Sequence, residues 1–534
     1  MDRDHDVLIV DGYVDEPSTL GVPPYIAPQV RMLAGCLEEL ELDWDYITVD
    51  EYRREGLSKA NKILVYGGVT VPGNYLRGRP ISEREANEIG RAGEETFIAG
   101  PLAKYGNVEN FDHVVKKDLP VYFYNHLSGR EEERWTNRKE MERWLKKGSV
   151  VVKKHPDFPD PLIVEISLYR GCVRYFTGGC SFCSEPHYGK PRFRKQKDIV
   201  TEIKELYEKG VRKFRIGGQS CTISYMAEGI GDTETPRPQP REVKKLFEGI
   251  WKNCPDIEVL HLDNANPSVV SNWPDESERV LRILVENTTP GNVLALGMES
   301  SDPRVIEENN LNSNPDEVYM AMELINKVGR KRGENGMPKL LPGLNFLAGL
   351  KKESSQTYKK NLSFLEKVLK NDILVRRINI RQVLSHTEDF EMNHKDDFKK
   401  FKENVRKKID RPMLRKIIPR GTVLKDVYME KRDGNKTFGR QIGTYPLLVG
   451  IEYPVELGKY KNIVVTDHGF RSVTGLAHPF KLGNASYEEL KAVPGLGERR
   501  AAKIFREQPD SWEEASEIID DKVTLEKLKK YAEI

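Results

Sequence analysis

Short apolar runs alternate with amphipathic helical patterns over residues 161–396. Runs such as Lys213–Ile216 and Val293–Met298 have the length of strands, whereas Pro240–Trp251 repeats its apolar residues with the period of a helix. Strands that alternate with helices predict a parallel sheet, because each helix returns the chain to the start of the next strand. The repetition predicts an α/β fold built on a partial or complete parallel (β/α) barrel. In such barrels the functional side chains gather at the C-terminal ends of the strands.

The remaining sequence divides into smaller units. Alternating strands and helices predict a small open α/β domain before the barrel, and short β runs with glycine turns predict a small β-barrel after it. The last unit has helical patterns interrupted by a Pro-Gly-Leu-Gly string. The predicted order is an α/β domain at 1–105, a linker with one helix at 106–160, the parallel barrel at 161–396, a basic linker at 397–419, the small β-barrel at 420–477 and a helical unit at 480–534.

The composition excludes several classes of protein. Lysine and arginine number 85 against 83 acidic residues, so the net charge of +2 excludes a uniformly basic surface but allows a local basic patch. Six cysteines in 534 residues are too few for a disulfide scaffold. The N-terminus lacks the pattern of a signal peptide, and no apolar run approaches the roughly 20 residues that span a bilayer. We therefore expect a cytoplasmic protein.

Three of the six cysteines, Cys172, Cys180 and Cys183, lie close together directly after the strand predicted at 162–168. Three thiolates on one loop can hold three corners of a 4Fe–4S cluster and leave one iron open to another ligand. The alternative is a structural zinc ion with His187 as the fourth ligand, because Cys180-x2-Cys183-x3-His187 also has the spacing of a zinc site. Spacing alone favours the iron–sulfur cluster and leaves zinc open.

The same segment resembles the cysteine loop of the radical S-adenosylmethionine (SAM) superfamily. Cys180-Ser181-Phe182-Cys183 matches the Cys-x-aromatic-Cys end of that loop, although seven residues separate the first two cysteines where the family usually has three. Gly217-Gly218-Gln219 is similar to the family's Gly-Gly-Glu motif at the SAM amino group, with glutamine in place of glutamate. Further resemblances in the expected order are Glu299 and Ser300 near the SAM ribose and carboxylate, and Gly349 and Phe182 beside the adenine.

The resemblance covers about residues 160–390 and implies a definite chemistry. Cys172, Cys180 and Cys183 would ligate one 4Fe–4S cluster, and an electron from the reduced cluster would cleave SAM. The resulting 5′-deoxyadenosyl radical takes a hydrogen atom from a carbon of the substrate. Such an enzyme also needs an electron donor, such as ferredoxin or flavodoxin.

The N-terminal region resembles the domains that precede the barrel in methylthiotransferases and in cobalamin-dependent members. It lacks the Asp-x-His-x-x-Gly string that normally ligates cobalamin, and of the three extra cysteines of methylthiotransferases only Cys36 is present. We therefore predict a single cluster, without cobalamin and without a second cluster.

Polar residues at two strand ends are candidate substrate contacts. His261, Asp263 and Asn266 lie at or after the end of the strand predicted at 258–262, and the last strand carries the second set, Arg377, Asn379 and Arg381. Alternation places this second set on one face of its strand, because successive side chains point to opposite sides. The pattern does not decide whether that face points into the barrel, and polar filling of the barrel is an equal alternative.

The C-terminal units indicate a polyanionic partner. Residues 420–477 resemble a TRAM domain, the small RNA-binding barrel of tRNA methylthiotransferases. Residues 487–504 resemble a helix–hairpin–helix motif, in which Gly495 and Gly497 would present backbone N–H groups to a phosphate. Arg499, Arg500 and Lys503 would add positive charge. Either unit could instead contact a protein.

The overall order of units resembles an archaeal group of radical SAM proteins with a C-terminal helix–hairpin–helix. We predict a transferase that modifies a carbon atom of RNA, and of tRNA in particular. One alternative is a radical SAM enzyme that acts on a protein or a small molecule and uses its C-terminal units for docking. Another is a zinc-stabilised nucleic-acid-binding protein without catalytic activity.

Overall fold

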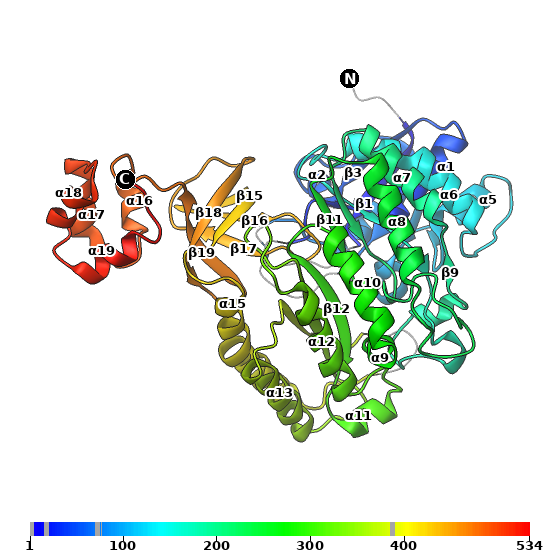
Figure 1. Cartoon of the computed structure of the whole chain (residues 1–534). Coiled ribbons are helices and arrows are strands. Elements are labelled where there is room, and N and C mark those ends of the chain that lie inside the picture. The colour runs from blue at the N-terminus through cyan, green and yellow to red at the C-terminus, as the bar shows by residue number, and fades with distance from the viewer. Residues whose placement is uncertain (1–4, 15–20, 70–74, 76, 385–389) are drawn as a thin grey trace.

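The computed structural model describes residues 5–14, 21–69, 75, 77–384 and 390–534. The chain forms an N-terminal α/β sheet, a parallel α/β barrel, a small closed β-barrel and a terminal group of helices (Figure 1). Within the described ranges, no helix is both long enough and apolar enough to cross a membrane.

The N-terminal unit is a five-stranded parallel sheet with the strand order β3-β1-β4-β5-β6. The predicted open sheet is confirmed, and its fifth strand lies beyond residue 105. Its strands are β1 (His5–Gly12), β3 (Trp44–Thr48), β4 (Ala60–Gly67), β5 (Glu95–Ala99) and β6 (His113–Val114). Its helices are α1 (Pro28–Glu39), α2 (Val49–Glu55), α3 (Glu83–Ile89), α4 (Pro101–Tyr105), α5 (Leu119–His126) and α6 (Arg138–Lys147).

The predicted parallel barrel is present in its partial form. One sheet has the order β11-β10-β7-β2 and the other β12-β13-β14, and the bridge between Ala265 and Leu296 joins β11 to β12. Strand β2 (Tyr25–Ile26) comes from the N-terminal region, and β2 and β14 are the two unjoined edges. The other barrel strands are β7 (Ile163–Ile166), β10 (Lys213–Ile216), β11 (Val259–Leu262), β12 (Asn292–Glu299), β13 (Leu340–Ala348) and β14 (Arg377–Gln382).

The barrel helices begin and end close to the predicted positions. Proline in the first turn of α8, α10 and α12 fits, because a first-turn residue has no intrahelical partner for its N–H. The prediction that Asp198 caps α7 is wrong: the cap position is Lys195, and Asp198 lies in the first turn. These helices are α7 (Gln196–Glu208), α8 (Pro240–Asn253), α9 (Pro267–Asn272), α10 (Pro274–Asn287), α11 (Pro303–Glu308), α12 (Pro315–Gly329) and α13 (Ser355–Lys370).

The predicted small β-barrel is confirmed as a closed five-stranded barrel with the order β15-β16-β17-β19-β18. The basic segment before it is helical, in α14 (Lys395–Asn404), a π-helical stretch at 405–410 and α15 (Arg411–Ile417). The strands of this C-terminal barrel are β15 (Val423–Asp433), β16 (Lys436–Gln441), β17 (Leu448–Ile451), β18 (Tyr460–His468) and β19 (Ser472–His478).

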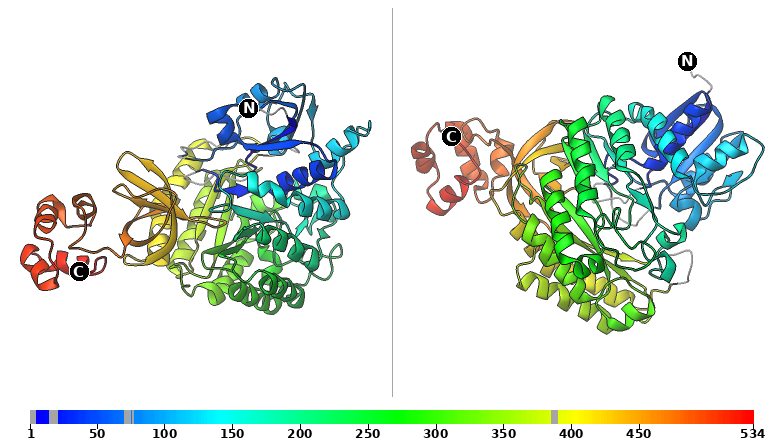
Figure 2. Two further views of the ribbon diagram at one scale, coloured as in Figure 1. Left: turned by 90° about the horizontal axis from the view of Figure 1, so that it is seen from above. Right: turned by 45° about the vertical axis from the view of Figure 1, so that its right-hand side comes forward.

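The last four helices project from the C-terminal barrel, away from the parallel barrel and the N-terminal sheet (Figure 2). They are α16 (Tyr487–Lys491), α17 (Gly497–Glu507), α18 (Trp512–Ile518) and α19 (Lys522–Leu528). A bridge between Lys481 and Glu533 closes this group on itself. Figure 2 shows the N-terminal sheet on the other side of the parallel barrel, so the barrel occupies the middle of the molecule.

Buried arginines connect the units. Arg31 of α1 pairs with Glu202 of α7, which also lies 2.6 Å from Arg194. Burial opposes the charge of Glu202, but the two arginines hold its pKa below the ordinary value. Arg440 of β16 donates to the carbonyl oxygens of Gly21 and Val22 at 3.1 and 3.2 Å. The parallel barrel is therefore attached to the N-terminal sheet by one buried arginine and the C-terminal barrel to the N-terminal region by another.

Candidate functional site

The cysteine loop follows β7 and is closed at its base by a two-stranded clasp. Strand β8 (Tyr169–Arg170) pairs antiparallel with β9 (Arg192–Phe193), so the intervening residues form one loop at the carboxyl edge of the barrel. Gly179 in this loop has φ +66°, and a Cβ there would lie 2.3 Å from Pro186. The loop therefore requires glycine at this position.

Arg174 interacts with two of the three cysteines. Its backbone N–H lies 3.4 Å from Cys172 Sγ, and its Nη1 lies 3.3 Å from Cys180 Sγ. Burial raises the pKa of Cys180 to about 11 and that of Cys183 to about 12, although Arg174 acts against this at Cys180. Because metals bind thiolates, these thiols must lose their protons as a metal group binds.

The spacing of the sulfurs distinguishes between a cluster and zinc. In the part of the chain that the structure describes, one group of three His, Cys, Asp or Glu side chains has its donor atoms within 4.8 Å of one another, and no cysteine belongs to it. Zinc holds sulfur at about 2.3 Å, so tetrahedral ligands lie roughly 3.8 Å apart. His187 is exposed to solvent. The cysteines therefore suit a larger group such as an iron–sulfur cluster better than a single zinc ion.

The Gly217-Gly218-Gln219 motif follows β10, beside the cysteine loop. Gly218 has φ +74°, and a Cβ on Gly217 would lie 2.3 Å from a carboxylate oxygen of Glu165. The amide nitrogen of Gln219 donates to Ile216 O and Thr222 Oγ1, both at 3.1 Å, whereas its buried Oε1 has no partner in the structure. An unpartnered buried acceptor is costly, and it fits the ammonium group of an amino-acid ligand.

Glu299 ends β12 with an unusual backbone conformation and an isolated side chain. Its φ is +58°, which is rare for residues other than glycine and is typical of strained functional positions. Burial raises the pKa of its carboxyl to about 8. Ser300, its neighbour, is fully buried and its hydroxyl accepts from the N–H of Asp302 at 3.2 Å. Glu299 is therefore available to a ligand, while Ser300 is used by the turn.

Phe182 and Gly349 lie in the same apolar neighbourhood. Phe182 and Cys180 pack against a small cluster that contains Leu350 and Val383. Gly349 ends β13 with φ +91°, and its N–H donates to Glu353 Oε2 at 2.8 Å. The structure thus brings the cysteine loop and the strand-five glycine motif together, although they are far apart in the sequence.

The substrate candidates on β11 are engaged by the C-terminal barrel. The N–H of Thr444 donates to His261 Nδ1 at 3.2 Å, and the hydroxyl of Tyr445 donates to Asp263 Oδ1 at 2.6 Å. Burial lowers the pKa of His261 to about 4, so its imidazole is neutral. Asn266 accepts from Ser268 N and Val269 N as the cap of α9. These three side chains serve packing and capping in this structure.

The polar face of β14 points into the barrel, a question that the sequence left open. Ile378 and Ile380 are buried, and Arg377, Asn379 and Arg381 share the other face. The guanidinium of Arg377 lies 4.2 Å from the ring of Tyr445, whose hydroxyl reaches Asp263 on the facing wall. Sequence reasoning missed Tyr445, because nothing in its local sequence indicates that it enters another unit.

The C-terminal glycines have the expected local form. Gly495 and Gly497 have φ +86° and +72°, and nothing lies within 4 Å of a Cβ added to either. Arg499 is exposed, and Lys503 is half-buried. Arg500 lies 2.8 Å from Asp520 and is therefore paired. The hairpin leaves its glycines open to solvent at the start of α17.

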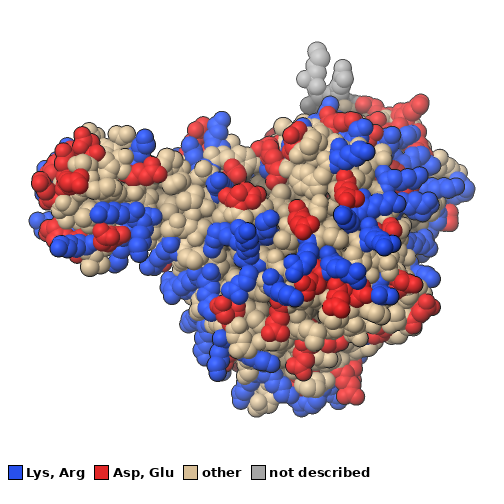
Figure 3. All heavy atoms as spheres, viewed as in Figure 1, with Lys and Arg blue, Asp and Glu red and all other residues tan. Residues whose placement is uncertain are grey.

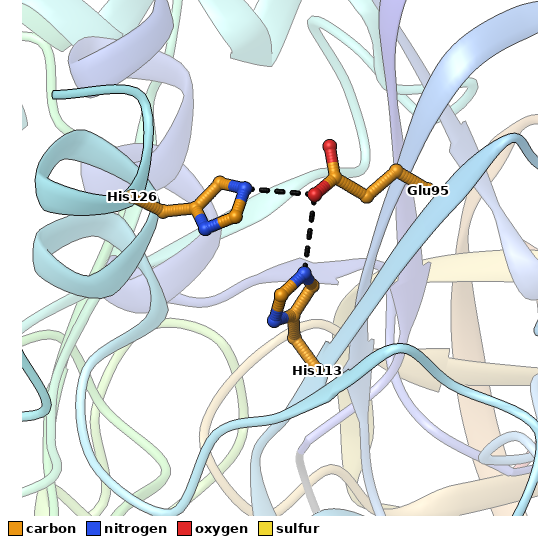
Figure 4. Close-up of side chains that lie close together, drawn as sticks. All are labelled: Glu95, His113 and His126. Carbon is orange, nitrogen blue, oxygen red and sulfur yellow. Dashed lines mark hydrogen bonds and ion pairs between the residues drawn. The ribbon is translucent and has the colours of Figure 1, made fainter. Parts of the chain in front are cut away.

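A second set of metal-type donors lies in the N-terminal sheet, away from the cysteines. His126 Nε2 and His113 Nε2 lie 2.7 and 3.1 Å from the same oxygen of Glu95 (Figure 4). The other oxygen of Glu95 pairs with Lys62, and Tyr122 lies 3.0 Å from His113 Nδ1. Burial opposes the charge of Glu95, but Lys62 and the two histidines lower its pKa to about 2. This donor set could hold a divalent metal, and as it stands it is an ion-paired cluster.

Comparison with known proteins agrees with this geometry. The radical SAM superfamily domain matches residues 166–365. A tRNA-2-methylthio-N(6)-dimethylallyladenosine synthase of Parabacteroides distasonis is 22% identical over 204 residues, 38% of this chain and 39% of that protein. The solved structure of the radical SAM methyltransferase TsrM from Kitasatospora setae, with tryptophan and a SAM analogue bound, has 14% identity and a TM-score of 0.45, covering 70% of this chain and 72% of that one.

A much nearer relative covers almost the whole molecule. An uncharacterized protein of Methanocaldococcus jannaschii is 42% identical over 503 residues, which are 88% of this chain and 92% of that protein. Such identity over nearly full length establishes common descent and a common fold. The chain belongs to the same family as this archaeal protein, and it is a radical SAM enzyme.

Proposed function

We propose that the protein binds one 4Fe–4S cluster at Cys172, Cys180 and Cys183 and uses it to cleave SAM reductively. The observation that carries this proposal is the clasped cysteine loop beside the unpartnered Oε1 of Gln219 at the carboxyl edge of the barrel. A cluster bound there supplies the electron that breaks the bond between sulfur and C5′ of SAM. The 5′-deoxyadenosyl radical then takes a hydrogen atom from a substrate carbon.

The residues around the loop have separate roles in this proposal. Gln219 accepts a hydrogen bond from the SAM ammonium group, and Glu299 faces the ribose. Phe182 packs beside the adenine, and the bare backbone of Gly349 allows close approach. The apolar cluster around Phe182 excludes water from the radical. Electrons come from a small redox protein such as ferredoxin or flavodoxin.

We further propose that the substrate is RNA, specifically tRNA, and that a carbon atom of a nucleotide is modified. Two observations support this: the distant similarity to a tRNA-modifying synthase, and a closed β-barrel followed by an exposed glycine hairpin. A protein or small-molecule substrate is the second candidate. The engagement of His261 and Asp263 by the C-terminal barrel leaves few polar groups in the barrel interior to bind a small polar molecule.

The test uses the full chain, purified without oxygen and supplied with iron and sulfide. Incubation with SAM and dithionite should produce 5′-deoxyadenosine, and a protein that binds zinc and produces none would overturn the enzymatic proposal. The substrate is tested with bulk tRNA from a strain that lacks the gene. New modified nucleosides detected by mass spectrometry would support tRNA as the substrate. Deoxyadenosine formation without any change in the tRNA would favour the second candidate.

A further inference from the structure

A groove runs along α14 at the place where the C-terminal barrel meets the parallel barrel. Its volume is about 390 Å³, and four of the seven side chains that line it are cationic. Glu403 is the one carboxylate among them. The lining residues are Phe398, Lys399, Lys402, Glu403, Arg406, Lys407 and Phe470. On the face seen in Figure 3, lysine and arginine side chains gather around α15 and the adjoining edge of the C-terminal barrel.

Arginines continue the groove inward. A smaller cavity shares Phe470 with it and is lined by Arg376, Arg377 and Arg471, with Asp410 as the carboxylate. Arg406 pairs with that carboxylate, so Asp410 is already neutralised. The Nε of Arg376 is buried and has no hydrogen-bond partner in the structure. The described side chains that line the two cavities thus comprise seven cations and two carboxylates, and burying this excess is unfavourable unless an anion joins it.

Titration behaviour shows the same crowding of positive charge. Burial and the neighbouring Arg377 lower the pKa of Arg376 to about 10. Burial, Arg406 and Arg471 likewise lower the pKa of Lys402. An anion in the groove would relieve these effects, because an opposite charge favours the protonated forms.

Aromatic side chains distinguish the groove from a simple phosphate site. Phe470 lines both cavities, and 45% of its surface is exposed. Phe398 is half-buried at the same groove. Cationic grooves that carry exposed aromatic rings are typical of single-stranded nucleic-acid sites, where lysine and arginine contact phosphates and bases stack on the rings. An inorganic anion or an acidic peptide gives no reason to expose such a ring.

The groove also has a structural connection to the barrel mouth. The ring of Phe398 lies 6.4 Å from that of Tyr358, whose hydroxyl donates to Glu353. The same carboxylate accepts from Gly349 N in the strand-five motif. At the inner cavity Arg377 begins β14, and the six residues of this strand lead to the carboxyl edge, about 17 Å away. A strand of nucleic acid in the groove would therefore lie within a few nucleotides of the SAM site.

We propose that this groove binds a single-stranded segment of the RNA substrate and so positions a neighbouring nucleotide at the barrel mouth. The inference rests on the proposed function, since it assumes an RNA substrate. It assigns the main docking site to the junction between the two barrels, where lysines and arginines contact phosphates and Phe470 stacks on a base. The terminal hairpin then adds a second, more distant contact.

The test measures binding of bulk tRNA to the full chain at several salt concentrations. The variant carries Lys399→Glu and Lys407→Glu, and the matched control carries Lys245→Glu and Lys252→Glu on the outer face of α8. All four lysines are exposed. We expect the groove variant to bind at least tenfold more weakly and to lose about one unit of log–log salt slope per phosphate contact, whereas the control changes little. Formation of 5′-deoxyadenosine from SAM alone should be unchanged in both.

A second variant separates stacking from charge. Phe470→Ala should weaken binding about tenfold without changing the salt slope, and Phe470→Tyr should restore binding. Equal binding by the groove variant and the lysine control would overturn the groove while leaving the RNA substrate standing. Failure of the unaltered protein to bind any tRNA would overturn both proposals. Competition by poly-L-glutamate as strong as that by RNA of equal charge would mean that the groove takes an acidic polypeptide, and would also overturn the inference.

Discussion

The parallel barrel contains two polar regions of opposite character. Inside it, Arg215 lies 3.0 Å from Asp263, Tyr445 donates to the same carboxylate, and Tyr25 donates to Glu165. At its mouth, the Oε1 of Gln219 has no partner, and burial alone sets the raised pKa of Glu299. The interior has satisfied its polar groups within the protein, whereas the mouth keeps groups that require a ligand. Polar side chains in a barrel thus indicate function only where their partners are missing.

The largest expected effect belongs to the cysteine loop at the mouth. Cys183→Ala should remove one corner of the cluster site and abolish formation of 5′-deoxyadenosine, because two thiolates do not hold a 4Fe–4S cluster. The measurement is product formation together with iron content per chain. Cys254→Ala is the matched control, since Cys254 is buried at the end of α8 and outside the loop. Loss of iron in the control but not in Cys183→Ala would contradict the assignment.

The interior network should respond through stability. Asp263→Asn leaves the buried guanidinium of Arg215 facing a neutral amide, which should cost about 3–5 kcal/mol in the free energy of unfolding. Chemical denaturation of the apoprotein measures this cost. Adding Arg215→Met to the same chain should restore part of the stability, because the unpaired charge is then removed. A double variant less stable than Asp263→Asn would show that the pair is not the relevant contact.

Glu299 should make the stability of the apoprotein depend on pH. Its pKa is raised from 4.5 to about 8 in the folded protein, so between these values the folded state holds a proton that the unfolded state has released. Stability contributed by this proton is therefore lost as the pH rises from 5 to 8, by about 2–4 kcal/mol. Glu299→Gln should have a flatter profile in urea denaturation. Identical profiles for the two proteins would show that Glu299 is already paired.

The smallest expected effect concerns the contact between the barrels. Tyr445→Phe keeps the ring beside Arg377 and removes only the hydrogen bond to Asp263, at a cost of about 1–2 kcal/mol. The thermal midpoint of the apoprotein should fall by a few degrees, while formation of 5′-deoxyadenosine is retained. A large loss of activity at unchanged stability would move Tyr445 from packing to catalysis and would weaken the contrast between interior and mouth.

Much of the fold is predictable because its signals are local. Helices such as Pro315–Gly329 and strands such as Lys213–Ile216 show their apolar period within one short window, and they form where the pattern places them. The cap of α7 was the exception: Asp198 has a capping side chain, but the helix begins earlier, at Gln196 after Lys195. Local capping preference is weak compared with the packing of the whole helix.

The candidate site was only partly predictable for the same reason. The cysteines, the glycine motif and Glu299 each carry a signal in neighbouring residues. The roles of His261 and Asp263 do not, because Thr444 and Tyr445 approach them from a unit some 180 residues away in the sequence. The groove likewise combines the basic helix α14 with Phe470, and only folding brings these together.

The sequence by itself determined the order of the units, the cysteine loop and the SAM motifs, since these depend on residue type and short spacing. Only the tertiary structure decided which face of β14 points inward, which polar groups are satisfied and which are left open. The physical reason is that hydrogen bonding and burial are properties of neighbours in space. A buried polar group is costly without a partner, and whether Gln219 or Asp263 has one depends on chain segments far from it in the sequence.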